Sequence, residues 1–225
     1  MMIVEFAGLP GGGKTTVCSL VLDKLKAAGI SAANIHKSEK NLSTLQRKLY
    51  SFRSVHAPFL RDLRKEVVKY CSRYNGENNA QRPGNFMLKA VYKLRQPEIR
   101  ALDCVVMDEG PTQYLTAIPH KSPLAGDADA LVRKLNEEFY SEPVLLFEIQ
   151  SGVDAAMERI RARGHSQDRF YSEDEGELRD MLLAKGKNLD NAMSRLNYAK
   201  HYVINNDNAE RAAEEVFQHI MAYRK

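Results

Sequence analysis

The stretch Gly8-Leu9-Pro10-Gly11-Gly12-Gly13-Lys14-Thr15 decides the fold of this chain. It matches in full the phosphate-binding pattern of a glycine, four residues, a glycine, a lysine and a serine or threonine. The residues before it, Met2 to Ala7, are typical of a short apolar strand, and those from Thr15 to Ala28 predict a helix that closes at Gly29. Because a strand and a helix flank the pattern, we interpret the stretch as a P-loop.

Each residue type in this loop serves a separate part of phosphate binding. The glycines allow backbone conformations in which successive N–H groups point at a phosphate chain; they are Gly8, Gly11, Gly12 and Gly13. We expect Lys14 to reach the β- and γ-phosphates of ATP and the Thr15 hydroxyl to coordinate Mg²⁺. Thr16 is expected nearer the α-phosphate.

The composition predicts one α/β domain over residues 1–225. The chain has 225 residues and a net charge of +4, enough length for a full core. Its cysteines, Cys18, Cys71 and Cys104, lack metal-ligand spacing, so we expect them to be reduced core residues in a cytoplasmic protein. The apolar runs are of strand length and the N-terminus holds no export signal, so we expect no membrane partner.

Positive charge is concentrated in the middle of the chain. Residues 42–100 hold 13 Lys or Arg against four acids, and their pattern is helical throughout. We therefore predict a helical insertion on the side of a second substrate, the acceptor. The positive charge of this insertion either favours an anionic acceptor or belongs to a solvated helix face. Its aromatic side chains either stack on a planar substrate or pack in the core.

Acidic residues follow two predicted strands. Glu39 comes after a short strand at Asn34 to Lys37, where it either contacts the acceptor or caps a turn. The apolar run from Leu102 to Met107 ends in Asp108 and Glu109, the Walker B arrangement, in which Asp108 would hold Mg²⁺. Glu109 would position an attacking water, as in ATPases, or act on an acceptor hydroxyl as its base or ligand.

Arginines follow the fourth predicted strand, Pro143 to Ile149. In the helix from Val153 to Arg163, Arg159 and Arg163 lie four residues apart and share a face. Such a helix is either a basic surface helix or part of a lid whose arginines stabilise the charge of phosphoryl transfer. With a P-loop in the chain, the lid is the better interpretation.

Several segments together resemble the P-loop nucleoside and nucleotide kinases, and among them the thymidylate-kinase-like proteins. They are Phe6 to Thr16, Gln150 to Asp154, Met157 to Ile160, Arg163-Gly164 with Asp168-Arg169, and Val203 to Asp207. The resemblance implies a three-layer P-loop fold with five parallel strands flanked by helices and a helical insertion between strands 2 and 3. It also implies ATP with Mg²⁺ as donor.

The same resemblance assigns further site residues. It implies a mobile lid over about residues 159–176, formed by Arg159, Arg161 and Arg163, with Arg169 as a further candidate. It also places the loop containing Asn206 and Asp207 beside the adenine of ATP. The motifs that bind the acceptor in thymidylate kinases, Arg-Glu-Pro and Asp-Arg-Tyr, read here Lys37-Ser38-Glu39 and Asp108-Glu109-Gly110, so the resemblance does not identify thymidylate as the acceptor.

Two functions remain open from the sequence. The leading one is a kinase that transfers a phosphoryl group from ATP to a small acceptor, anionic or nucleoside-like, with Lys14, Asp108, Glu109, Glu39, Arg159 and Arg163 as catalytic candidates. The alternative is an ATPase or switch that hydrolyses ATP through Asp108 and Glu109 and is coupled to a protein or nucleic-acid partner. The arginine lid favours the kinase, for which nucleic acid is not an expected partner and a homodimer stays open.

Overall fold

Five parallel strands form the centre of the computed structural model, which describes residues 1–36, 43–74, 80–119, 122–124, 128–164 and 172–224. The strand order is β2-β3-β1-β4-β5, with β1 in the middle. The strands are β1 Met2–Gly8, β2 Ala32–Asn34, β3 Cys104–Met107, β4 Val144–Gln150 and β5 Lys200–Asn205. Every residue of β1 and β3 is buried, which suits parallel strands covered on both faces. The predicted five-stranded parallel sheet is therefore confirmed.

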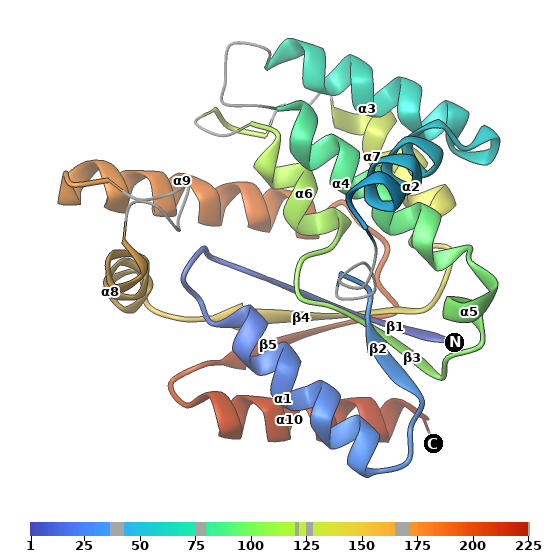
Figure 1. The fold of residues 1–225 in the computed structure, drawn as a ribbon. Coiled ribbons are helices and arrows are strands. Elements are labelled where there is room, and N and C mark those ends of the chain that lie inside the picture. Colours follow the sequence, from blue (N-terminus) through green and yellow to red (C-terminus); the bar gives the residue numbers. More distant parts are fainter. Residues whose placement is uncertain (37–42, 75–79, 120–121, 125–127, 165–171, 225) are drawn as a thin grey trace.

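Helices cover both faces of this sheet (Figure 1). Helices α1, Lys14–Ala27, and α10, Ala209–Arg224, lie together below the sheet in this view and share a core with its lower face. The opposite face carries α6 Pro111–Ala117, α7 Asp129–Glu138 and α9 Glu175–Met193. Helix α8, Val153–Arg163, follows β4 and packs against α9 through a small apolar cluster. Helices α1, α6 and α8 follow β1, β3 and β4, so all three begin near the carboxyl ends of these parallel strands.

The segment between β2 and β3 is helical, as the sequence indicates. It contains α2 Thr44–His56, the 3₁₀ turn Pro58–Leu60, α3 Arg61–Arg73, α4 Gln81–Leu94 and α5 Pro97–Arg100. Leu63 of α3 and Met87 of α4 belong to the same buried cluster as Val105 of β3. The inserted helices therefore share the hydrophobic core of the sheet and do not build a separate one.

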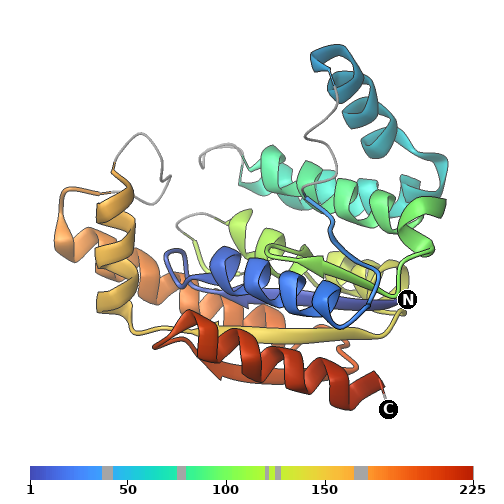
Figure 2. The same cartoon turned by 60° about the horizontal axis from the view of Figure 1, so that its bottom comes forward.

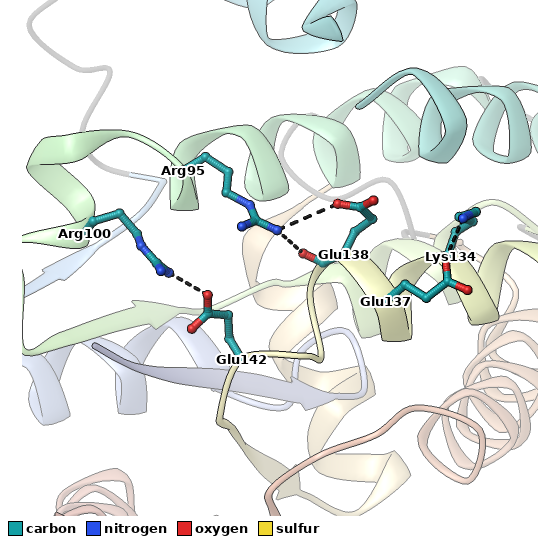
Figure 3. Close-up of polar contacts among 6 residues, drawn as sticks. All are labelled: Arg95, Arg100, Lys134, Glu137, Glu138 and Glu142. Atoms are coloured by element: carbon teal, nitrogen blue, oxygen red, sulfur yellow. Dashed lines mark hydrogen bonds and ion pairs between the residues drawn. The ribbon is translucent and has the colours of Figure 1, made fainter. Parts of the chain in front are cut away.

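Ion pairs join the end of this insertion to the rest of the chain (Figure 3). The Arg95 guanidinium donates to the main-chain carbonyl of Glu138 at 3.2 Å, and the Arg100 Nη1 atom lies 2.7 Å from a Glu142 carboxylate oxygen. Two of the 13 cations between residues 42 and 100 therefore bind acids outside the insertion. Their charge is used in the fold, not offered to a substrate.

The structure differs from the sequence interpretation at two elements. Strand β2 ends at Asn34, three residues before the predicted end, and Lys37 and Glu39 lie outside the described residues. Helix α6 was not predicted: Pro111 occupies its first turn, where a proline is favoured, and all seven of its residues are buried. The sequence did not indicate this burial because α6 contains polar Thr and Gln side chains. These side chains are buried with hydrogen bonds inside the protein.

Two compositional expectations can be compared with the fold. Cys18, Cys71 and Cys104 are free and buried, as expected for core residues. Among the described residues, no helix is long and apolar enough to cross a membrane.

Candidate active site

The P-loop adopts a backbone that favours glycine at three positions, Gly8, Gly11 and Gly13, of which the last two lie in the left-handed region. Gly11 and Gly13 have φ angles of 76° and 87°, in the left-handed region that side-chain-bearing residues rarely occupy. A Cβ atom on Gly11 would lie 2.5 Å from the Ala156 carbonyl oxygen, and one on Gly13 would lie 2.4 Å from the Asn206 amide nitrogen. Sterics therefore explain these glycines, and the loop keeps the predicted tight turn.

The first turn of α1 is built to receive an anion. Gly13, the residue that precedes the helix, offers no side-chain cap, so no side chain satisfies the first N–H groups from that position. Lys14 is buried, and its ammonium donates to the carbonyl oxygens of Gly8 and Leu9 at 3.1 and 3.0 Å. Thr16 is exposed in the same turn. Uncapped N–H groups and a lysine held at the loop form a phosphate-binding arrangement.

Thr15 and Asp108 meet at the mouth of the loop, although 93 residues separate them in the sequence. The Thr15 hydroxyl donates to one Asp108 oxygen at 3.1 Å, and the Asn34 amide donates to the other at 3.2 Å. A hydroxyl and a carboxylate are the hard oxygen donors that Mg²⁺ prefers, and Mg²⁺ takes its remaining ligands from water and phosphate. The residues present therefore fit this ion, with Asn34 orienting the carboxylate.

The three arginines of α8 that the sequence predicted as part of a lid have different surroundings. Arg159 is half-buried, and its guanidinium donates to the Gly11 carbonyl at 3.2 Å, so it already lies against the P-loop. Arg161 is turned toward α9, where it lies 3.4 Å from a Glu175 oxygen. Arg163 is exposed in the last turn, next to Gly164, and Arg169 lies outside the described residues. Arg159 therefore has a hydrogen bond to the P-loop backbone.

Asn206 supports the P-loop from the end of β5. Its side chain is buried and donates to the Gly12 carbonyl at 2.7 Å, while its main-chain N–H donates to Gln150 at 2.8 Å. Asp207, by contrast, is exposed and accepts from the Asn205 amide. The sequence resemblance placed the loop that contains both residues beside the adenine of ATP, and in the structure the Asn206 side chain holds the P-loop backbone.

Two buried residues that the sequence did not single out connect α6 to β1. Gln113 of α6 accepts a hydrogen bond from the Gly8 N–H at 3.4 Å. Glu5 of β1 accepts from the Thr112 N–H and from the Tyr140 hydroxyl, both at 2.9 Å. Complete burial raises the pKa of Glu5 from 4.5 to about 7. This network fixes the start of α6 and hence the turn that carries Asp108.

A small pocket of about 130 Å³ lies between α4 and the segment that follows β2. It is lined by His36, Phe86, Lys89, Ala90 and Lys93. The His36 ring bonds the main-chain oxygen of Glu109 at 2.5 Å, so the pocket adjoins the Asp108–Gly110 turn. Tyr114 stacks on Phe86 with their ring centres 5.7 Å apart. Glu39, which the sequence predicted as an acceptor contact or a turn cap, lies outside the described residues, and Glu109 is half-buried and meets the pocket residue His36 through its main-chain oxygen.

Known structures share this fold. No family model matches the chain, and no curated protein matches it. A solved structure of deoxyadenosine kinase from M. mycoides, with products dCMP and dCDP, has a TM-score of 0.57 at 10% identity and covers 99% of this chain and 100% of its own. The fold is that of a P-loop nucleoside kinase.

Two further structures of that kinase are similar to the chain. The one with bound dATP has a TM-score of 0.53 at 14% identity and covers 98% of this chain and 100% of its own. The one with bound dCTP has a TM-score of 0.53 at 12% identity and covers 99% of this chain and 100% of its own. All three structures share the fold of this chain, and all three are of deoxyadenosine kinase, not of the thymidylate-kinase-like proteins that the sequence resembled.

Proposed function

We propose that this protein is an ATP- and Mg²⁺-dependent kinase that phosphorylates a nucleoside or a nucleoside monophosphate. The observation that carries the proposal is the 3.1 Å contact between the Thr15 hydroxyl and the Asp108 carboxylate at the mouth of the P-loop. It brings the two predicted magnesium ligands together across 93 residues. The shared fold with a solved nucleoside kinase supports the same reaction class.

The residues around the loop have separate tasks in this proposal. Lys14 and the N–H groups of the first α1 turn bind the β- and γ-phosphates, and Thr15 and Asp108 hold the magnesium ion. When bound, that ion neutralises charge on the phosphates. Arg159, next to the Gly11 carbonyl, is the cation best placed to meet negative charge that develops on the transferred group. Arg163 would join it from the same face of α8.

The pocket between α4 and β2 is our proposed acceptor site. The Phe86 ring lines the pocket and stacks on the buried Tyr114, and we propose that a planar nucleobase stacks on Phe86. Lys89 and Lys93 contribute positive charge to its wall, which favours an acceptor that carries phosphate. Glu109, whose main chain borders the pocket through His36, is the carboxylate proposed to accept the proton of the acceptor hydroxyl.

An assay of ADP formation with a panel of acceptors tests this function. The purified protein is supplied with ATP and Mg²⁺, first alone and then with individual nucleosides and their 5′-monophosphates. We expect turnover only in the presence of one of these acceptor classes. We also expect Phe86→Ala to raise the KM for that acceptor. Equal ADP formation without an acceptor would replace the kinase by the hydrolytic alternative, in which Glu109 acts on water.

A further inference from the structure

Helix α2 presents an apolar stripe to the solvent. Leu45, Leu49 and Phe52 have exposed fractions of 76%, 49% and 63%, which are high for large apolar side chains. They lie at positions i, i+4 and i+7 of the helix and therefore share one face. Three such residues in a row on one helix are an unusual feature of a protein surface, where exposed apolar side chains are normally scattered.

The stripe faces away from the body of the protein. With about 100° of rotation per residue, Ser54 lies on the side of α2 opposite Leu45, and Ser54 is fully buried. That buried side includes Tyr50, whose ring packs edge-on against Tyr92 of α4. Figure 2 shows α2 at the outer limit of the molecule, above α3 and α4. None of the stripe residues lines the proposed acceptor pocket, so the stripe and the pocket are distinct.

Positive charge surrounds the stripe, and negative charge is absent from this part of the sequence. The same helical rotation places Lys48 on one side of the stripe and Arg53 on the other, and both are exposed. From Ser43 to Leu60 the sequence contains three cations, Arg47, Lys48 and Arg53, and no Asp or Glu. A partner for this face must therefore combine apolar contact with negative charge.

We propose that α2 docks this protein on an anionic phospholipid surface. A single convex helix with leucine and phenylalanine between basic residues has the character of helices that lie in the interfacial layer of a membrane. This proposal departs from the expectation of no membrane partner, which rested on the lack of apolar spans and of an export signal, because docking of this kind needs no spanning segment; the described helices include none. A second copy of the chain fits less well, because a symmetric contact would oppose cations with cations.

Only a few residues supply the binding energy, so the association is weak and reversible. Each Lys or Arg near an anionic surface strengthens binding about fivefold, and this contribution decreases as salt screens the charges. Neutralising both Lys48 and Arg53 should therefore weaken binding by about 25-fold. The proposal concerns a surface outside the active site and does not depend on the proposed kinase activity.

Vesicle flotation with the full chain tests the proposal. The probes are phosphatidylcholine vesicles with and without phosphatidylserine, at low and high salt. We expect the protein to float only with the anionic vesicles, and less so as salt increases. We expect Leu49→Gln with Phe52→Gln, and separately Lys48→Gln with Arg53→Gln, to abolish most of this binding while circular dichroism and thermal unfolding show a folded chain.

Matched controls come from other elements. Leu183 of α9 has an exposed fraction of 48%, close to that of Leu49, so Leu183→Gln removes an equivalent apolar group elsewhere. Lys26→Gln with Arg133→Gln removes the same net charge from α1 and α7. These controls should bind like the unchanged chain. Equal flotation with both kinds of vesicle, equal loss in the controls, or no flotation at all would overturn the proposal. So would a dimer in sedimentation velocity that Leu49→Gln dissociates.

Discussion

Replacing the buried Glu5 by glutamine should stabilise the protein in alkaline solution and have less effect in acid. Glu5 is completely buried, and its two oxygens accept from the Thr112 N–H and the Tyr140 hydroxyl. Burial raises its pKa from 4.5 to about 7 because the charged carboxylate loses its hydration. Glutamine has the shape of the protonated acid and cannot ionise, so it removes this cost.

The size and sign of the effect follow from the pKa. Between pH 4.5 and about 7 the folded chain retains a proton that the unfolded chain has lost, so the free energy of unfolding decreases as pH rises through this range. A rise from 4.5 to about 7, at about 1.4 kcal/mol per unit, corresponds to about 3 kcal/mol above pH 7. This value is an upper limit for the gain on substitution, since glutamine also changes one hydrogen bond.

Thermal and urea unfolding at about pH 8 and about pH 5 measure the effect. We expect Glu5→Gln to raise the unfolding free energy at the higher pH and to lose that advantage at the lower one. Glu98→Gln, at an exposed carboxylate of α5, serves as the matched control and should show neither change. If Glu5→Gln destabilised the chain equally at both pH values, Glu5 would be an ionised hydrogen-bond acceptor and our reasoning would be refuted.

The remaining predictions concern the P-loop and its arginine. Lys14→Ala should abolish ATP turnover while circular dichroism shows the fold intact. An unchanged rate of ATP turnover would contradict the P-loop assignment. Asn206→Ala should raise the KM for ATP and destabilise the chain by about 1–3 kcal/mol in urea unfolding, because the Gly12 carbonyl loses its buried partner; an unchanged KM would contradict this supporting role. Arg159→Ala should lower kcat by about 10³-fold or more with a much smaller effect on ATP affinity, whereas Arg161→Ala, whose partner is Glu175, should lower kcat far less. Equal effects of the two substitutions on kcat would argue against a special position of Arg159.

The parts of the site that the sequence predicted are those encoded in short local patterns. The P-loop glycines, Lys14 and Thr15 occupy a fixed spacing, and Asp108 stands at the end of a continuous apolar run, so each has a signal within a few residues. The structure brings Thr15 and Asp108 into contact as the interpretation requires. The parallel sheet and the helical insertion follow from equally local periodicity.

The contacts that the sequence did not reveal join residues that are far apart in the chain. The Asn206 side chain meets Gly12 across 194 residues, and Gln113 meets Gly8 across 105. No pattern near either residue specifies its partner, because the contact exists only once β5 and α6 have packed beside the loop. Glu5 was hidden for a related reason: a lone acid in an apolar strand becomes informative when Tyr140 and Thr112 are seen around it.

Following the γ-phosphate of labelled ATP tests the central claim most directly. The protein is incubated with Mg²⁺, γ-labelled ATP and the acceptor that best stimulates ADP formation, and the label is separated into phosphorylated acceptor and inorganic phosphate. Our account predicts that nearly all of the label appears on the acceptor and that Lys14→Ala transfers none. Label found in inorganic phosphate, in the same amount with or without acceptor, would contradict the account and show that the site hydrolyses ATP.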